Sequence, residues 1–227
     1  MKRIHVFLRK SRSAKKYLSQ DGFYLLFCRL LRHVTYGIRD WILSKKAKCP
    51  PLHLGESPKL IGLSNISFGH SFRSGKDLWL EAVIRFQGIT YSPQIVIGDN
   101  VGVSDNVHIG ATNRVTIGCG VLIGSRVIII DHNHGIYSGD HQSVPGIPPN
   151  LRRLDADRCV FIGNNVWIGD GVAVLPGATI GDGSIIGANS VVTGTIPANC
   201  IAMGSPARPV RHFDEASGIW KRVEAPK

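Results

Sequence analysis

Aliphatic residues recur every six positions over much of this chain, and most of them are followed by glycine or another small residue. The pattern begins at Ile97-Gly98, stops after Ile123-Gly124, and resumes from Ile162-Gly163 to Val192-Thr193. The fifth residue of most hexads is also small or branched, as at Val166. A period of six fits neither an amphipathic helix nor an alternating strand, and it is typical of a parallel β-helix.

Each hexad would supply one short strand and one corner of a coil, with its aliphatic side chain pointing into a narrow core. Three hexads would complete a triangular coil, so residues eighteen apart would stack at about 4.8 Å. This spacing predicts interior columns made of Ile162, Ile180 and Ala198 and of Ile168, Ile186 and Gly204. No coil can bury its core alone, so the fold depends on stacking.

The pattern divides the chain into three parts. Residues 1–50 form a helical segment, residues 51–204 form the β-helix, and residues 205–227 form a C-terminal tail with a short helix ending near Val223. Within the β-helix, residues 52–96 form irregular first coils, and the repeat slips by two residues at Asn113-Arg114. A long loop over 135–159 interrupts the coils, and such loops in compact domains usually line a site.

The first part of the chain combines an apolar stripe with almost all of the excess charge. The formal net charge is +11, and residues 1–48 hold 13 Lys and Arg against 2 Asp and Glu. The apolar positions repeat at three- and four-residue steps: Phe23, Leu26, Phe27, Leu30, Val34, Ile38, Trp41 and Ile42. The stripe is too short and too interrupted to span a membrane, and no signal peptide is expected.

Two interpretations of residues 1–48 remain open. A basic amphipathic helix can lie on an anionic membrane as a peripheral anchor. It can equally cap the open end of the β-helix while its Lys and Arg are solvated. No nucleic-acid binding is expected, because no recognised module accompanies the charge. The five scattered cysteines indicate reduced thiols and a cytoplasmic protein.

The residues before the long loop are the best candidates for chemistry. The sequence Asp131-His132-Asn133-His134 stands where the repeat stops. Histidine suits general-base catalysis because its ordinary pKa lies near neutrality. A sugar hydroxyl needs such a base when it attacks an acyl group.

Over residues 97–211 the chain resembles the hexapeptide-repeat acyltransferases, which have a left-handed parallel β-helix and assemble as trimers. The resemblance is most specific at Ile162–Gly169, at Leu175–Asp182 and at Gly204–Arg208. Residues 131–153 are similar to the branch that acts on bacterial surface polysaccharides. The fold class expected is therefore all-β, a left-handed parallel β-helix with an N-terminal helical segment and an inserted loop.

The resemblance implies roles for individual residues. Counting without gaps along the family pattern makes His134 the catalytic base, with His132 as the alternative. The implied coenzyme A contacts are Trp167, Asp170, Ala188, Thr193, Arg208 and Arg211. The implied acceptor-binding residues are Ser104, Asn106, Asp131 and Tyr137. The chain departs from the pattern at Gly194, where the family usually has Lys, and at Ser104, where it has Asn.

The predicted function is an acetyl-CoA-dependent O-acetyltransferase that modifies a sugar hydroxyl in capsule, O-antigen or exopolysaccharide biosynthesis. No metal is expected, and the expected partners are a sugar or lipid-linked glycan acceptor and two further copies of the chain. The alternatives are an antibiotic or amino-sugar acetyltransferase, a metal enzyme resembling the γ-type carbonic anhydrases that would use His108, His132 and His134, and a non-catalytic scaffold.

Overall fold

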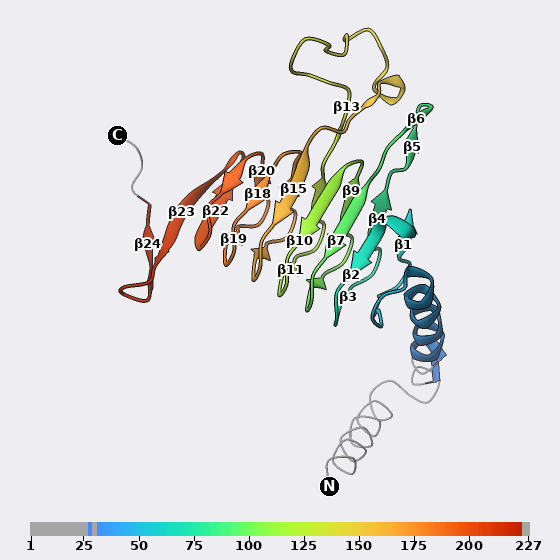
Figure 1. Ribbon diagram of the computed structural model, residues 1–227. Coiled ribbons are helices and arrows are strands. Elements are labelled where there is room, and N and C mark those ends of the chain that lie inside the picture. Colours follow the sequence, from blue (N-terminus) through green and yellow to red (C-terminus); the bar gives the residue numbers. More distant parts are fainter. Residues whose placement is uncertain (1–26, 29–30, 224–227) are drawn as a thin grey trace.

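The structure is a computed structural model that describes residues 27–28 and 31–223. Its main body is a parallel β-helix in which the chain visits three sheets in turn and then rises by one coil (Figure 1). We number the sheets 1, 2 and 3 in the order in which the chain enters them, and we name each corner by the two sheets it joins.

Each sheet is built from strands of successive coils in parallel register. Sheet 1 contains β1 (Lys59–Ile61), β4 (Trp79–Ala82), β9 (His108–Ala111), β12 (Ile128–Ile130), β17 (Ala173–Val174) and β20 (Val191–Val192). Sheet 2 contains β2 (Ile66–Phe68), β7 (Gln94–Ile97), β10 (Arg114–Ile117), β15 (Cys159–Ile162), β18 (Thr179–Ile180) and β21 (Thr195–Ile196). Sheet 3 contains β3 (Arg73–Ser74), β8 (Gly102–Val103), β11 (Leu122–Ile123), β16 (Trp167–Ile168), β19 (Ile185–Ile186), β22 (Cys200–Gly204), β23 (Ala207–Asp214) and β24 (Ile219–Arg222).

The core is a set of stacked aliphatic columns, which confirms the interpretation of the six-residue repeat. Ile109 pairs with Ile129 and Ile129 with Val174, and all three are fully buried. The small fifth residues of the hexads, such as Val166 and Ser184, are buried as well. Each coil therefore covers the apolar surface of the next, as a solenoid requires.

The two predicted interior columns are correct in pairing Ile162 with Ile180 and Ile168 with Ile186, but wrong in their third residues. Ile180 pairs with Ile196 rather than Ala198, and Ile186 pairs with Ala202 rather than Gly204. The last coil is two residues shorter than eighteen because the turn at Thr193-Gly194 is contracted. The two-residue slip at Asn113-Arg114 is confirmed, because Ile97 pairs with Ile117 twenty residues later.

Every departure from the eighteen-residue coil falls at the corner between sheets 1 and 2. Between β4 and β7 the chain forms a hairpin of β5 (Arg85–Phe86) and β6 (Ile89–Thr90). Between β12 and β15 it forms the long loop, which contains β13 (Asn133–His134), η2 (Pro149–Leu151) and β14 (Leu154–Asp155). Both insertions project from the same side of the β-helix (Figure 1). A short turn, η1 (Leu63–Asn65), joins β1 to β2 at this corner in the first coil.

The N-terminal helix, residues 31–47 in the described part, lies beside the first coil (Figure 1). Leu43 packs against the core, while Leu52 and Leu54 of the following segment belong to it. The helix thus lies at the open end of the β-helix, as one of the two interpretations expected. Phe23 and Leu26 of the predicted stripe fall outside the described residues, as do the side chains of Arg29 and Leu30. No helix among the described residues is long and apolar enough to cross a membrane.

The tail differs from its prediction. Instead of a short helix ending near Val223, β23 and β24 form an antiparallel hairpin that continues sheet 3 beyond residue 204. Phe213 stacks edge-on against Trp220, with ring centroids 5.3 Å apart. The hairpin covers the edge of β22, which would otherwise expose unpaired backbone groups at the end of the solenoid.

Candidate active site

A buried carboxylate holds one of the two candidate histidines at the corner between sheets 1 and 2. Asp131 is fully buried, and its Oδ1 lies 2.9 Å from Nδ1 of His132. The same carboxylate accepts hydrogen bonds from the backbone N–H groups of Thr112 and Asn113, each at 2.8 Å. A carboxylate accepts hydrogen bonds, so this contact assigns the N–H of the neutral His132 ring to Nδ1 and leaves Nε2 as its acceptor nitrogen.

The two inserted residues of the preceding coil explain why Asp131 can be buried. Thr112 and Asn113 form the turn that lengthens that coil to twenty residues, and they aim both of their N–H groups at the carboxylate. The hydroxyl of Thr112 donates a further bond of 3.1 Å. A buried charge is tolerated only with such partners. The sequence gives no reason for the two-residue slip in the repeat. In the structure the inserted turn binds the carboxylate that orients His132.

His134 lies in a different environment. Its backbone belongs to β13 and pairs with Leu154 of β14, and its exposed side chain meets Phe86 of the β5–β6 hairpin edge-on at 5.2 Å. No carboxylate contacts its ring in the described part of the chain. Tyr137, which is predicted to bind the acceptor, donates its hydroxyl to the backbone carbonyl of His134 and accepts a bond of 2.8 Å from Arg152.

The hairpin and the long loop contact one another beside these histidines. Gln87 donates to the backbone carbonyl of Asn150 at 2.6 Å, and the hydroxyl of Tyr91 accepts from the N–H of Leu154 at 3.2 Å. A cavity of about 150 Å³ lies between the two insertions, lined in part by Tyr91, Asp155 and Asp157. Sequence reasoning missed the hairpin as part of the site, and its only signal was the irregular spacing of residues 52–96.

A second unexpected feature is an aromatic stack on the outer face of sheet 1. Lys59 lies over the ring of Trp79 at 3.7 Å, and Trp79 stacks on His108 at 4.0 Å. His108 Nε2 and Trp79 Nε1 are buried without a hydrogen-bond partner. Burial lowers the pKa of His108, and the neighbouring charges of His132 and Lys59 lower it further. His108 therefore stays neutral at the pH at which an ordinary histidine begins to titrate.

Three of the six predicted coenzyme contacts come together in one groove. Trp167, Asp170 and Ala188 line a groove of about 350 Å³ at the corner between sheets 3 and 1. The Asp170 carboxylate is held there by the N–H of Ser125 at 2.8 Å. Trp167 leaves half of its surface exposed. Thr193, Arg208 and Arg211 lie outside this groove, on the last coil and on β23.

The two arginines are only loosely held. Arg208 donates to the backbone carbonyl of its neighbour Ala207 at 3.0 Å, and Arg211 to that of Trp220 at 3.3 Å. Their guanidinium groups keep donors free for a ligand. Ser104 and Asn106 lie at the corner between sheets 3 and 1 in an earlier coil, so the structure does not bring them to His132 in the same chain. Asn106 has a left-handed backbone, with φ of 58°, that forms the corner.

The described residues contain no group of three or more His, Cys, Asp or Glu side chains placed to hold a metal ion. His108 and His132 are neighbours across Gly110. All five cysteines are free thiols, and burial raises the pKa of Cys200 and of Cys49.

The chain is thus a stacked parallel β-helix with a carboxylate-bound histidine at one corner and an open groove at another, and comparison with known proteins identifies the class to which it belongs. The model of the bacterial transferase hexapeptide (six repeats) matches residues 159–194. The chain is 44% identical over 160 residues to the putative lipopolysaccharide biosynthesis O-acetyl transferase WbbJ of Escherichia coli (strain K12), a match that covers 70% of this chain and 78% of that protein. The chain therefore belongs to the hexapeptide-repeat family of acyltransferases.

Two further relatives agree with this assignment. The galactoside O-acetyltransferase of Escherichia coli (strain K12) is 36% identical over 146 residues, which cover 62% of this chain and 64% of that protein. The crystal structure of AntD, an N-acyltransferase from Bacillus cereus in complex with dTDP and 3-hydroxybutyryl-CoA, superposes with a TM-score of 0.58 at 18% identity. That match covers 73% of this chain and 82% of AntD and shows the fold alone. The expected left-handed parallel β-helix is thereby confirmed.

Proposed function

We propose that this protein is an acetyl-CoA-dependent O-acetyltransferase that modifies a sugar hydroxyl in the biosynthesis of a bacterial surface polysaccharide. The observation that carries the proposal is the buried Asp131–His132 pair beside the long loop, in a chain 44% identical to a putative lipopolysaccharide biosynthesis O-acetyl transferase. Because coenzyme A thioesters are made inside the cell, the proposed place of the reaction is the cytoplasm.

His132 is the base that the geometry favours. Its Nδ1–H donates to Asp131, so Nε2 takes the proton of the acceptor hydroxyl while the hydroxyl oxygen attacks the thioester carbonyl carbon. When the carbon–sulfur bond breaks, the imidazolium returns that proton to the departing sulfur. Asp131 is a positioning residue that fixes the tautomer and stabilises the positive ring, as the carboxylate does in a serine protease triad. No acyl-enzyme is formed.

The groove of Trp167, Asp170 and Ala188 is the proposed seat of the pantetheine arm of the donor. Glycine and alanine along this corner leave the backbone open to an extended ligand, and Trp167 offers an apolar wall. Arg208 and Arg211 follow on β23, where their free donors suit the phosphates of the nucleotide end. Thr193, exposed on the contracted turn between these regions, completes the proposed set.

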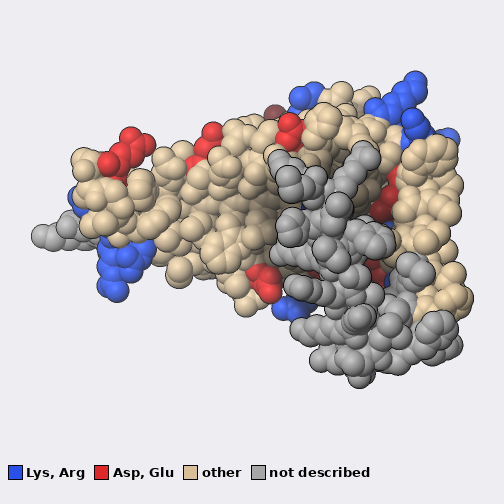
Figure 2. All heavy atoms as spheres, turned by 90° about the horizontal axis from the view of Figure 1, so that it is seen from below, with Lys and Arg blue, Asp and Glu red and all other residues tan. Residues whose placement is uncertain are grey.

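The positions of the two half-sites support a homotrimer. His132 lies at the corner between sheets 1 and 2, whereas the groove lies at the corner between sheets 3 and 1 of the same coils. A second copy that brings its groove to the first copy's His132 would complete the site, and cyclic symmetry would repeat this contact at every interface. Outward apolar residues along the coils, such as Leu122 and Phe161, are available for this packing, and the visible coil surface is mostly uncharged (Figure 2).

The assay that tests the activity supplies acetyl-CoA with a panel of sugars, an amino sugar, chloramphenicol and a lipid-linked glycan extract, and reads products by mass spectrometry. We expect an acetylated sugar hydroxyl. His132→Ala should lower kcat by about 10²–10⁴-fold, the usual contribution of a general base. His134→Ala is the matched control in the same loop and should stay within about tenfold. The reverse pattern would assign the base to His134, and acetylation of chloramphenicol or an amine alone would replace the proposed acceptor.

The shared site is tested by mixing two inactive chains. His132→Ala removes the base, and Ala188→Trp fills the groove, so each variant alone should be inactive. If each site combines the base of one copy with the groove of the next, co-expressed chains should regain about a quarter of the wild-type activity by random assembly. Activity that stays at the level of the separate variants would place both halves of the site in a single chain.

A further inference from the structure

The N-terminal helix turns its apolar side away from the protein. The exposed positions lie on one face over more than three turns: Phe27, Leu31, Val34, Ile38, Trp41 and Ile42, each about half exposed or more. We call this set the apolar stripe. The buried positions of the same helix are polar, because Asp40 and Ser44 are 7% and 6% exposed. An ordinary surface helix has the opposite arrangement.

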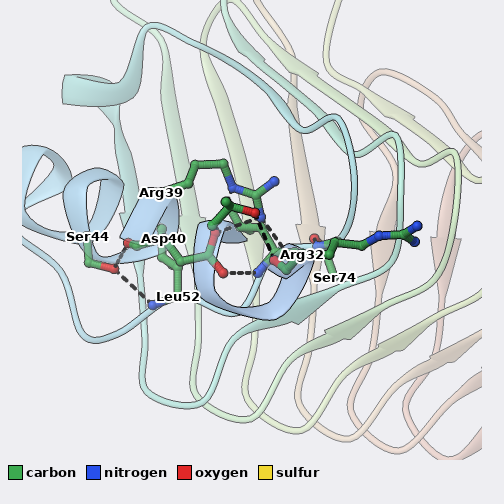
Figure 3. Close-up of polar contacts among 9 residues, drawn as sticks. Arg32, Arg39, Asp40, Ser44, Leu52 and Ser74 are labelled. Atoms are coloured by element: carbon green, nitrogen blue, oxygen red, sulfur yellow. Dashed lines mark hydrogen bonds and ion pairs between the residues drawn. The ribbon is translucent and has the colours of Figure 1, made fainter. Parts of the chain in front are cut away.

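Buried hydrogen bonds fix this orientation (Figure 3). The carboxylate of Asp40 accepts from the N–H of Leu54 at 2.9 Å, and Ser44 Oγ accepts from the N–H of Leu52 at 3.0 Å. Arg39 donates to Asp40 and to the carbonyl of Leu54, at 2.7 and 2.8 Å. These bonds satisfy the backbone of the segment that enters the first coil. Rolling the helix to bury the apolar stripe would break the three bonds to Leu52 and Leu54 and leave buried polar groups unpaired.

The charge around the apolar stripe indicates what covers it. Lys45, Lys46 and Lys48 follow the last turn of the stripe. Residues 1–48 together hold 13 basic and 2 acidic side chains, whereas the rest of the chain is balanced. A second copy of this face would bring two strongly positive segments together, which costs electrostatic energy. An anionic surface with an apolar interior matches both the charge and the stripe.

We propose that the apolar stripe docks on an anionic membrane, with the helix lying in the plane of the interface. Trp41 and Phe27 would enter the boundary between headgroups and acyl chains, and the lysines would contact the headgroup charge. The β-helix, attached to the opposite face through Asp40 and Ser44, would be held beside the bilayer. The proposal goes beyond the proposed acetyl transfer and does not depend on it.

The test is sedimentation of the full chain with vesicles. We expect binding to phosphatidylglycerol vesicles and little binding to phosphatidylcholine vesicles. Val34→Ser, Ile38→Ser and Trp41→Ser combined should weaken the binding at least about tenfold, since each side chain loses its burial in the interface. The matched control replaces three equally exposed apolar side chains of the long loop, Val144, Ile147 and Leu151, with Ser, and should bind within about twofold of wild type.

The outcomes separate this proposal from others. Lys45→Gln, Lys46→Gln and Lys48→Gln combined should also weaken binding and reduce its sensitivity to salt. Vesicle binding that is lost in high salt but unaffected by the stripe variant would overturn the proposal, because charge alone would then suffice. The proposal would also be overturned if the wild type bound no vesicles and formed a larger assembly in ultracentrifugation than the stripe variant. That result would assign the stripe to contact with a second copy. Acetyl transfer to a water-soluble acceptor should be the same in the stripe and lysine variants as in the wild type.

Discussion

At the scale of single residues, Asp131 and His132 show how the chain holds a histidine ring in a fixed orientation. The carboxylate of Asp131 accepts hydrogen bonds from two backbone N–H groups of an inserted turn and also contacts the imidazole of His132. Counting along the family pattern favoured His134, because such counting assumes no gap between the coil and the catalytic residue. The structure favours His132, because only that ring has a buried anionic partner among the described residues. The roles of both histidines remain predictions.

His108 gives a prediction about stability and pH. Burial, followed by the charges of His132 and Lys59, lowers its pKa in the folded protein. As the pH falls below about 6.5, the unfolded chain therefore binds a proton that the folded chain refuses. The free energy of unfolding should decrease from there down to the lowered pKa of His108 and then level off.

His108→Gln should remove this part of the pH dependence. The measurement is the Tm at about pH 7.5 and about pH 5.5, where the gap between the two values should be a few degrees smaller in the variant than in the wild type. His141→Gln, at an exposed histidine of the long loop, is the control and should keep the wild-type gap. An unchanged gap in His108→Gln would show that His108 titrates alike in both states.

At the scale of the elements, the coils are limited by how closely their corners approach. A Cβ added to Gly118 would lie 2.7 Å from the backbone carbon and oxygen of Gly163 in the next coil. Both corners are held by parallel strands on either side, so neither backbone can move freely. The small residues of the repeat therefore reflect contact between coils, in addition to the turn within each coil.

Gly118→Ala should destabilise the protein by about 1–3 kcal/mol, the usual cost of overpacking. Gly146→Ala is the control, because no heavy atom lies within 4 Å of its added Cβ and its backbone conformation is ordinary. That change should be neutral or stabilise by up to about 1 kcal/mol. Chemical denaturation of the three proteins measures both effects, and equal stability of Gly118→Ala and wild type would mean that the coils can separate at this corner.

At the scale of the whole molecule, the solenoid and the site are separable. Insertions and deletions occur only at the corner between sheets 1 and 2 in the coils from β4 onward, while the other two corners keep their length. One edge of the β-helix therefore carries the hairpin, the lengthened turn and the long loop. The remaining surface is left for the stacking of the coils and for the proposed coenzyme and subunit contacts.

Removing residues 132–158 tests this separation. Ile117 pairs with Ile162, 45 residues later, so a loss of 27 residues restores the ordinary eighteen-residue coil. The shortened chain should give the β-rich circular dichroism spectrum of the wild type and unfold cooperatively, because the core columns do not include the loop. It should have no transfer activity, since His132 is lost. Aggregation during expression would show that the loop is needed for the fold.

The six-residue period was enough to predict a parallel β-helix, and the family resemblance added its left hand. The positions of the coils, the slip at Asn113-Arg114 and the interruption after Asp131 all follow from a local repeat, because each hexad must place one aliphatic residue in the core. The candidate residues of the coenzyme groove, Trp167, Asp170 and Ala188, were also found from the pattern together with the family resemblance.

Other features needed the tertiary structure. The length of the last coil depends on which residues after Val192 reach the next column, and the chain could satisfy the repeat with Ala198 or with Ile196. The hairpin of the tail forms because β22 has an edge to cover, which no local pattern reveals. The contacts between Phe86 and His134 join segments far apart in the sequence.

The sequence by itself thus determined the architecture, because the repeat is local and every coil solves the same packing problem. Only the tertiary structure decided which histidine is oriented, since the partners of Asp131 come from the preceding coil. It also decided which face of the N-terminal helix is buried. Hydrophobicity along the helix left open whether the stripe from Val34 to Ile42 faces the β-helix or a membrane. In the structure the N–H groups of Leu52 and Leu54 are bonded by Ser44 and Asp40, so the polar side of the helix faces the β-helix.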